Sequence, residues 1–275
     1  MATIVTAFFP LEQSKHGVRK YMEWIRNFCA IPRPMVIVTT PKLAPLFERI
    51  REGSGGATHV IARELTEFAL ASPARMEMWQ RHWRMDPEAA IHNPELYVVW
   101  AIKQECVAAA IAANPFGHDW FVWCDIGIQR SPEMQRYYNT FPDAVTHQCV
   151  PGAIHFLEVV RIPDGLASRR GEVPMPYPPP SITLGGGCIA GDRAAWAAFS
   201  AGYTAMLNRF IERGWFAGKD QIVYLAMLME RVMPFRLFSA IRFGDDARGD
   251  PWMSFPVILG GQAKANVDAR FEEIA

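Results

Sequence analysis

The 275-residue sequence has no surplus of either charge, because 28 lysines and arginines balance 28 aspartates and glutamates. Proteins that bind nucleic acid by neutralising phosphates need a basic excess or patch, so we expect no nucleic-acid partner. The sequence also contains no run of about 18 uninterrupted apolar residues, the length that a membrane-spanning helix needs. We therefore expect no transmembrane segment, and peripheral attachment to a membrane remains compatible with the composition.

Cysteine is scarce, and its pattern excludes two classes of small stabilised domain. The five cysteines are odd in number, lie far apart and include no CxxC pair. They are Cys29, Cys106, Cys124, Cys149 and Cys188. This pattern predicts neither a disulfide framework nor a zinc site, so we expect reduced core thiols in a cytoplasmic protein. Residues 1–10 lack the basic start and small-residue cleavage site of a secretion signal, and we expect them to form a strand.

Several familiar catalytic motifs are also missing. The GxSxG nucleophile elbow of the serine hydrolases is absent from the sequence. The seven histidines are scattered without the spacing of metal ligands, and none follows His155. These absences direct attention to the acidic, basic and glycine residues that close the expected strands.

Half of the residues are hydrophobic, which predicts a sizeable core. Short β-branched and aromatic runs alternate with segments of helical periodicity. The expected strands are 3–8, 35–39, 58–62, 119–124, 153–160, 182–184 and 235–241. The expected helices are 16–29, a short helix opened by Pro41, 64–84 with a break at Pro73, 96–113, 196–211 and 219–232. This alternation predicts a single α/β domain over residues 1–275: a Rossmann-like, mostly parallel sheet with helices on both faces and an elaborated C-terminal half.

A carboxylate ends the apolar strand 119–124. Asp125 follows this strand directly, and Gly127 lets the chain turn close beside it. Ligands of parallel sheets bind beyond the carboxyl ends of the strands, where one carboxylate can share a divalent cation with substrate phosphates. The alternative is an aspartate that only caps a turn or helix. Trp123 is either a core residue or a surface on which a base or sugar stacks.

Lys103 lies at the centre of an apolar stripe when residues 96–113 are drawn as one helix. A lysine there needs an anionic partner or must extend its ammonium group to the surface. A bound diphosphate or Asp125 itself would satisfy the charge. A snorkelling side chain and a purely structural ion pair are the alternatives.

Glycines and acidic residues of the second half form a further group of interest. Gly185, Gly186 and Gly187 remove side chains from one path, so another molecule can approach the backbone. They belong to a GxGxxA match that lies too late in the chain for a dinucleotide fingerprint, which argues against a Rossmann-type oxidoreductase. Asp192 is expected to cap the following helix. Asp220 is either a helix cap or, with Gln221, a pair that binds sugar hydroxyls or carries acid–base chemistry.

Together these stretches resemble the HtrL/YibB-like family. The resemblance is carried by segments 3–9, 93–103, 114–116 and 123–127, by Gly185 to Gly187 with Gly191, and by Asp220 with Gln221, in the same order over most of the chain. The resemblance implies a role in bacterial surface polysaccharide synthesis and a hexosyltransferase-type glycosyltransferase of the A-type fold. It also implies a nucleotide-diphosphate sugar as donor and a glycan or lipid-linked acceptor. Residues 1–130 would be the nucleotide-sugar-binding half, and residues 131–275 the acceptor half.

The resemblance also implies roles for individual residues. The donor-binding set is Phe8, Lys103, Trp123, Asp125 and Gly127; the sugar- or acceptor-binding set is Gly185, Gly186, Gly187 and Asp192; the catalytic pair is Asp220 and Gln221. Asp125 would hold Mn²⁺ or Mg²⁺, and Lys103 would neutralise donor phosphate. Together they would stabilise the negative charge that grows on the leaving diphosphate as the sugar becomes oxocarbenium-like.

The sequence departs from the family pattern of A-type transferases at two points. The second aspartate of the usual Asp-x-Asp motif is Gly127 here, and the late histidine of the metal site is missing. Asp245, Asp246 and Asp250 are the candidates for a further ligand. These departures favour an alternative hypothesis, a catalytically inactive protein that binds nucleotide-sugar or glycan as an assembly subunit. The motif is compatible with either retention or inversion at the anomeric carbon.

Overall fold

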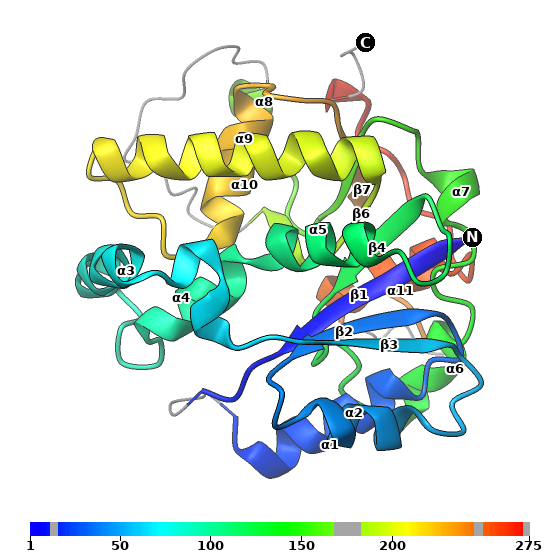
Figure 1. The fold of residues 1–275 in the computed structure, drawn as a ribbon. Helices are drawn as coiled ribbons and strands as arrows, with labels where there is room; N and C mark the ends of the chain where they lie inside the picture. Colours follow the sequence, from blue (N-terminus) through cyan, green and yellow to red (C-terminus); the bar gives the residue numbers. More distant parts are fainter. Residues whose placement is uncertain (12–15, 168–182, 245–249, 272–275) are drawn as a thin grey trace.

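A seven-stranded sheet forms the centre of the molecule (Figure 1). The computed structural model describes residues 1–11, 16–167, 183–244 and 250–271. The strands of this sheet are β1 (Ala2–Phe8), β2 (Met35–Thr39), β3 (Thr58–Ala62), β4 (Trp120–Cys124), β5 (Ile154–Glu158), β6 (Leu184–Asp192) and β7 (Phe235–Ser239). Their order is β3-β2-β1-β4-β6-β5-β7. The expected α/β class and mostly parallel sheet are confirmed.

The first four strands form a parallel half-sheet. β1 pairs with β2 and β4, and β2 pairs with β3, all in parallel. The order 3-2-1-4 is that of the first four strands of the Rossmann fold, whose ligands bind where the strand order reverses. Here that point lies beside the carboxyl ends of β1 and β4. Asp125, the residue after β4, is therefore positioned at the edge where a ligand is expected.

Helices cover both faces of the sheet (Figure 1). They are α1 (Val18–Cys29), α2 (Ala44–Arg51), α3 (Pro73–Met85), α4 (Pro94–Ala101), α5 (Lys103–Ala113), α6 (Gln135–Tyr138), α7 (Val145–Gln148), α8 (Asp164–Ala167), α9 (Arg193–Glu212), α10 (Asp220–Met229) and α11 (Phe255–Leu259). One buried cluster packs the sheet against α3, α4, α5, α9 and α10. A second packs the other face against α1, α2, α6, α7 and α11. Adjacent residues of β1 supply opposite clusters, because side chains of a strand alternate between its faces.

The helix expected over 96–113 is wrong as a single element. Ile102 adopts a non-helical conformation between α4 and α5, and the two axes form an angle of 42°. Lys103 is consequently the first residue of α5 rather than the middle of a continuous apolar stripe. The break expected at Pro73 is confirmed, because α3 begins there and proline fits the first turn of a helix better than its interior. Before the break, the expected helix is replaced by two short 3₁₀ turns, Leu65–Glu67 and Ala69–Ala71.

The sequence predicts a short strand at 182–184 that ends before the glycine cluster. In the structure, the glycine cluster is itself part of a strand, β6. β6 runs antiparallel to both β4 and β5, with Cys188 opposite Cys124. Pairing on both sides satisfies its backbone, so a glycine-rich segment that is weak by propensity still forms a strand. Because β6 runs against β4, its first residues lie at the carboxyl edge of the parallel strands. That orientation brings Gly186 and Gly187 to Asp125.

Among the described residues, no single helix is long and apolar enough to cross a membrane; α4 and α5 meet the criteria only when taken together across their bend. All five cysteines are buried and free, as the sequence predicted.

Candidate active site

A cleft of about 220 Å³ opens at the carboxyl edge of the sheet. It is lined by Glu88, His92, Trp100, Lys103, Asp125, Gly186, Gly187, Lys219, Asp220 and Gln221. These residues come from the end of β4, the start of β6, the first turns of α5 and α10, and the segment that leads into α4. Figure 1 shows α10 beginning beside the junction of α4 and α5. Six of the residues predicted for the site therefore meet here: Lys103, Asp125, Gly186, Gly187, Asp220 and Gln221.

Lys103 joins the two aspartates of the cleft. Its Nζ lies 2.8 Å from Oδ2 of Asp220 and 3.5 Å from Oδ1 of Asp125, and it donates a 2.8 Å hydrogen bond to the carbonyl oxygen of Gly186. The Lys103 side chain is only 3% exposed. Burial alone would lower the pKa of this ammonium, but the carboxylates of Asp125 and Asp220 outweigh burial and raise the pKa. Lys103 is therefore a buried, charged group whose donors are directed at three acceptors.

Asp125 presents a carboxylate of fixed orientation to the cleft. The indole Nε1–H of Trp123 donates a 2.8 Å hydrogen bond to Oδ1, and the side chain is 43% exposed. The cleft walls desolvate the carboxylate and raise its pKa, and Asp220 adds to this effect while Lys103 opposes it. Trp123 is itself buried, so it orients Asp125 rather than offering a stacking surface.

Asp220 lies deeper, under the glycine strand. Its side chain is 5% exposed, and Oδ1 accepts the backbone N–H of Gln221. The N-cap position of α10 is Lys219, so Asp220 is the first helical residue. A Cβ atom at Gly186 would come within 3.2 Å of Oδ2 of Asp220. Glycine at this position is thus required by the close approach of α10 to β6.

The opposite wall contains residues that the sequence did not single out. Nδ1 of His92 lies 2.7 Å from Oδ2 of Asp86, and the ammonium of Lys219 pairs with Glu88. Donor atoms of Asp86, Glu88 and His92 lie within 4.8 Å of one another, a spacing compatible with a metal ion. Their atoms are already engaged with one another and with Lys219, so we do not assign a metal to them. Only folding brings these side chains to the cleft, and no sequence spacing signals them.

The ionisable groups that line the cleft give it a net negative charge. The lining residues include two lysines and three carboxylates, a net charge of −1 when all are ionised. A diphosphate would be repelled by such a balance unless a cation accompanies it. Asp125 and Glu88 are the exposed carboxylates of the cleft, and Glu88 already pairs with Lys219. Carboxylate oxygen is the donor that Mg²⁺ and Mn²⁺ prefer. Its exposure and fixed orientation fit a single protein ligand to such an ion.

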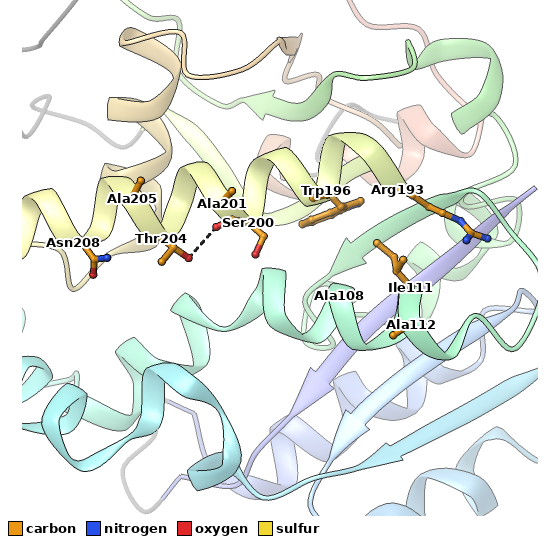
Figure 2. A pocket seen from close by; sticks show the side chains of 11 residues that line it. Ala108, Ile111, Ala112, Arg193, Trp196, Ser200, Ala201, Thr204, Ala205 and Asn208 are labelled. Carbon is orange, nitrogen blue, oxygen red and sulfur yellow. Dashed lines mark hydrogen bonds between the residues drawn. The ribbon is translucent and has the colours of Figure 1, made fainter.

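A larger groove of about 730 Å³ lies between α5 and α9, away from this chemistry (Figure 2). Alanine, serine and threonine side chains line most of it, and Arg193 is the charged residue among the lining. Figure 2 shows the side chains of Ile111 and Trp196 facing this groove from the two helices. The groove offers no carboxylate or paired donors for chemistry among its lining residues, so the smaller cleft is the candidate active site.

Several predicted site residues do not line the cleft. Phe8 packs against Tyr21 and Phe47, and Gly127 lies against Tyr21 and Trp24 of α1. Gly185 lies beside Leu157 and Val159.

Two aspartate predictions also fall elsewhere. Asp192 pairs in register with Trp120 at the far end of β4, where it caps α9 by accepting the N–H of Ala195. The structure thus confirms the capping expected for Asp192 and does not bring it to the cleft. Asp250 accepts the N–H of Trp252 and is not among the cleft residues. Asp245 and Asp246 lie outside the described residues.

Comparison with known proteins gives one match. Residues 1–228 match the family described as "Bacterial protein of unknown function (HtrL_YibB)". No curated protein matches the sequence. The matched segment includes every residue that lines the cleft.

Proposed function

This chain belongs to the HtrL/YibB family of bacterial proteins, and from that premise we propose that it is a glycosyltransferase that uses a nucleotide-diphosphate sugar. The proposed fold is the A-type glycosyltransferase fold, and the proposed acceptor is a glycan or a lipid-linked sugar. The observation that carries the proposal is the contact between Lys103, Asp125 and Asp220 at the point where the strand order reverses. Such a charged triad suits transfer from a diphosphate, because that reaction depends on stabilising the charge of the leaving group.

Lys103 acts in this proposal by positioning the carboxylates. Its ammonium is directed at Asp220, Asp125 and the carbonyl of Gly186, so it holds both aspartate side chains in one place. Lys219, which is more exposed and also lines the cleft, is free to exchange Glu88 for a donor phosphate. A divalent cation held by Asp125, when bound, would supply the charge that the leaving diphosphate needs. Gly186 and Gly187 let the side chains of Asp220 and Asp125 lie close to the backbone of β6.

A second candidate function rests on Gly127. This position would carry the second carboxylate of an Asp-x-Asp motif, but the residue is glycine and packs against α1. A protein with a single metal-binding carboxylate could bind a nucleotide-sugar and act as an assembly subunit without catalysing transfer. Binding without turnover is the result that this alternative predicts.

Calorimetry with nucleoside diphosphates tests the proposal. We expect UDP or another nucleoside diphosphate to bind more tightly with Mn²⁺ or Mg²⁺ than without, and Asp125→Ala to remove the effect of the metal. The matched control is Asp119→Ala, because Asp119 precedes the same strand that Asp125 follows and is exposed. A thermal-shift panel of nucleotide-sugars then selects the donor for assays of diphosphate release. Absence of nucleotide binding with and without metal would refute both candidate functions.

A further inference from the structure

An aspartate–histidine pair faces the cleft opposite Lys103. Nδ1 of His92 lies 2.7 Å from Oδ2 of Asp86, and the His92 ring packs edge-on against Trp100 at a centroid distance of 5.1 Å. The His92 side chain is 11% exposed and lines the cleft, whereas the Asp86 side chain is fully buried behind it. Nε2 of His92 makes no hydrogen bond to any residue within the described ranges. One nitrogen of the ring is thus fixed, and the other is available to a ligand.

Asp86 is held as an ionised acceptor. Burial would raise its pKa, but hydrogen bonds from the Tyr97 hydroxyl, from His92 and from the backbone N–H of Glu88 outweigh burial and lower the pKa. The Tyr97 hydroxyl lies 2.6 Å from the same Oδ2 that faces His92. An ionised carboxylate can only accept a hydrogen bond, so the nitrogen that faces it must donate one. Nδ1 of His92 therefore carries the hydrogen and Nε2 carries the lone pair. This assignment follows from the hydrogen-bond network.

The other acidic groups of the cleft are occupied by lysines. Asp220 is almost fully buried, and its Oδ2 lies 2.8 Å from Nζ of Lys103. Glu88 pairs with Lys219. Asp125 accepts a hydrogen bond from the indole N–H of Trp123 and lies 3.5 Å from the ammonium of Lys103. Among the lining residues, His92 differs because one of its two ring nitrogens, Nε2, makes no hydrogen bond within the described ranges.

We infer that His92 is the general base that takes the proton from the acceptor hydroxyl, with Asp86 and Tyr97 as positioning residues. This inference rests on the proposed glycosyltransferase function and deepens it. The hydroxyl proton passes to Nε2 of His92 while the hydroxyl oxygen forms a bond to the anomeric carbon. The bond from that carbon to the diphosphate oxygen breaks, and its electron pair stays on the diphosphate. His92 then releases the proton to water, so the products are the glycoside, the nucleoside diphosphate and one proton.

A single displacement of this kind inverts the anomeric configuration. The acceptor oxygen attacks from the face opposite to the leaving diphosphate, and no covalent sugar–enzyme intermediate forms. The inference thereby predicts inversion, which the sequence motif alone leaves open. The charged groups that surround the cleft with the imidazole are Asp86 and Glu88 on its own segment, Lys219 and Asp220 from α10, Lys103 from α5 and Asp125 after β4.

Nitrogen-15 NMR of the whole protein tests the geometry without any substrate. We expect the His92 resonances of the neutral ring to show a protonated Nδ1 and an unprotonated Nε2. The variant Asp86→Asn should lose this preference because an amide can donate to Nδ1 instead. A protonated Nε2 in the wild-type protein would overturn the inference while leaving the proposed function untouched.

Kinetics of His92→Gln test the chemistry. We expect kcat to fall by about 10²- to 10⁴-fold, the usual contribution of a general base, while the affinity for nucleoside diphosphate changes less than threefold. The acidic limb of the wild-type pH profile, where a protonated imidazole cannot accept a proton, should disappear. Imidazole added to a His92→Gly variant should restore part of the rate. The matched control is His147→Gln, because His147 is exposed on α7.

The outcomes separate a failure of the base assignment to His92 from a failure of the proposed glycosyltransferase function. A His92→Gln variant that retains kcat and the wild-type pH profile, or a product of retained configuration by proton NMR, would overturn the base assignment with donor binding intact. Wild-type protein that binds no nucleoside diphosphate would refute the proposed function, and the base assignment would fall with it. Asp86→Asn and Tyr97→Phe should lower kcat less than His92→Gln does, because they act only through the orientation of the ring.

Discussion

The Nζ atom of Lys103 lies 2.8 Å from Oδ2 of Asp220, and the two residues are the first residues of α5 and α10. A helix N-terminus carries partial positive charge, which suits Asp220 and disfavours Lys103. The lysine is held in this unfavourable position by Asp220, Asp125 and the carbonyl of Gly186. Such an arrangement costs stability locally and is typical of a functional site rather than of a structural ion pair.

The variant Lys103→Met tests the energetic role of this contact. It leaves Asp220 buried without its counter-charge, which we expect to lower the free energy of unfolding by about 3–5 kcal/mol. Urea denaturation measures the change against Lys42→Met, whose lysine is exposed. The double variant Lys103→Met/Asp220→Asn should recover most of the loss, because it removes the charge as well as its partner. A single variant as stable as the control would contradict the buried pair.

Replacing Asp125 by asparagine should stabilise the protein at neutral pH. Desolvation and Asp220 raise the pKa of Asp125 against the opposing Lys103, so the folded state favours the protonated carboxyl. This group therefore makes the wild-type protein less stable as pH rises from the ordinary aspartate value of about 3.9 through the raised pKa. Asparagine removes the ionisation. Thermal unfolding should show a higher Tm for Asp125→Asn at pH 7 and no difference at pH 4, and Asp119→Asn should match the wild type at both.

An alanine at Gly186 should disturb the cleft through contact with α10. Its Cβ would lie 3.2 Å from Oδ2 of Asp220 and 3.2 Å from Cγ of Gln221. The start of α10 would have to shift, and overpacking of this kind costs about 1–3 kcal/mol. Gly165→Ala is the control, because no atom lies within 4 Å of a Cβ there. For Gly186→Ala, the free energy of unfolding and the affinity for nucleoside diphosphate should both be lower than for the wild type. If Gly186→Ala and Gly165→Ala behave alike in both measurements, the close approach of α10 to β6 is refuted.

Protonation of His155 should destabilise the fold in mild acid. Its Nδ1 lies 3.1 Å from the carbonyl oxygen of Ala190, and its Nε2 accepts the N–H of Val150, a pair that only the neutral ring can make. Burial lowers its pKa to about 4. The folded state thus binds fewer protons than the unfolded chain, and stability is lost as pH falls from about 6.5 towards 4.

Urea denaturation between pH 7 and pH 5 measures this loss. The variant His155→Gln should show a flatter pH dependence than the wild type. His147→Gln should keep the wild-type slope, because His147 is exposed. Identical slopes for all three proteins would contradict a depressed pKa at His155.

Local sequence predicted the strands more accurately than the helices. The runs 35–39 and 58–62 match β2 and β3 in full, because β-branched residues bounded by turns favour a strand regardless of context. The break at Ile102 escaped prediction because residues 94–113 contain no internal proline or glycine. It follows instead from the packing that turns Lys103 towards Asp220. The strand β6 escaped prediction for the opposite reason, since its glycines disfavour a strand until β4 and β5 pair with it.

The candidate site divides in the same way. Asp125 was predicted because a carboxylate after an apolar strand is a local pattern, and Lys103 because an apolar neighbourhood requires an anionic partner for its charge. The structure places these two side chains 3.5 Å apart in an open cleft. His92 and Asp86 carried no comparable signal, since their hydrogen bond depends on the irregular turn that the chain makes before α4.

The amino-acid order by itself thus determined the α/β class, the parallel core strands and the acidic residue at their carboxyl edge, because these depend on side chains close together in the chain. Tertiary structure alone decided which charges meet across the cleft, that Lys103 begins a helix, and that the His92 side chain lines the same cleft. Those features depend on contacts between β4, β6, α5 and α10, and contacts between distant segments exist only after the chain has folded.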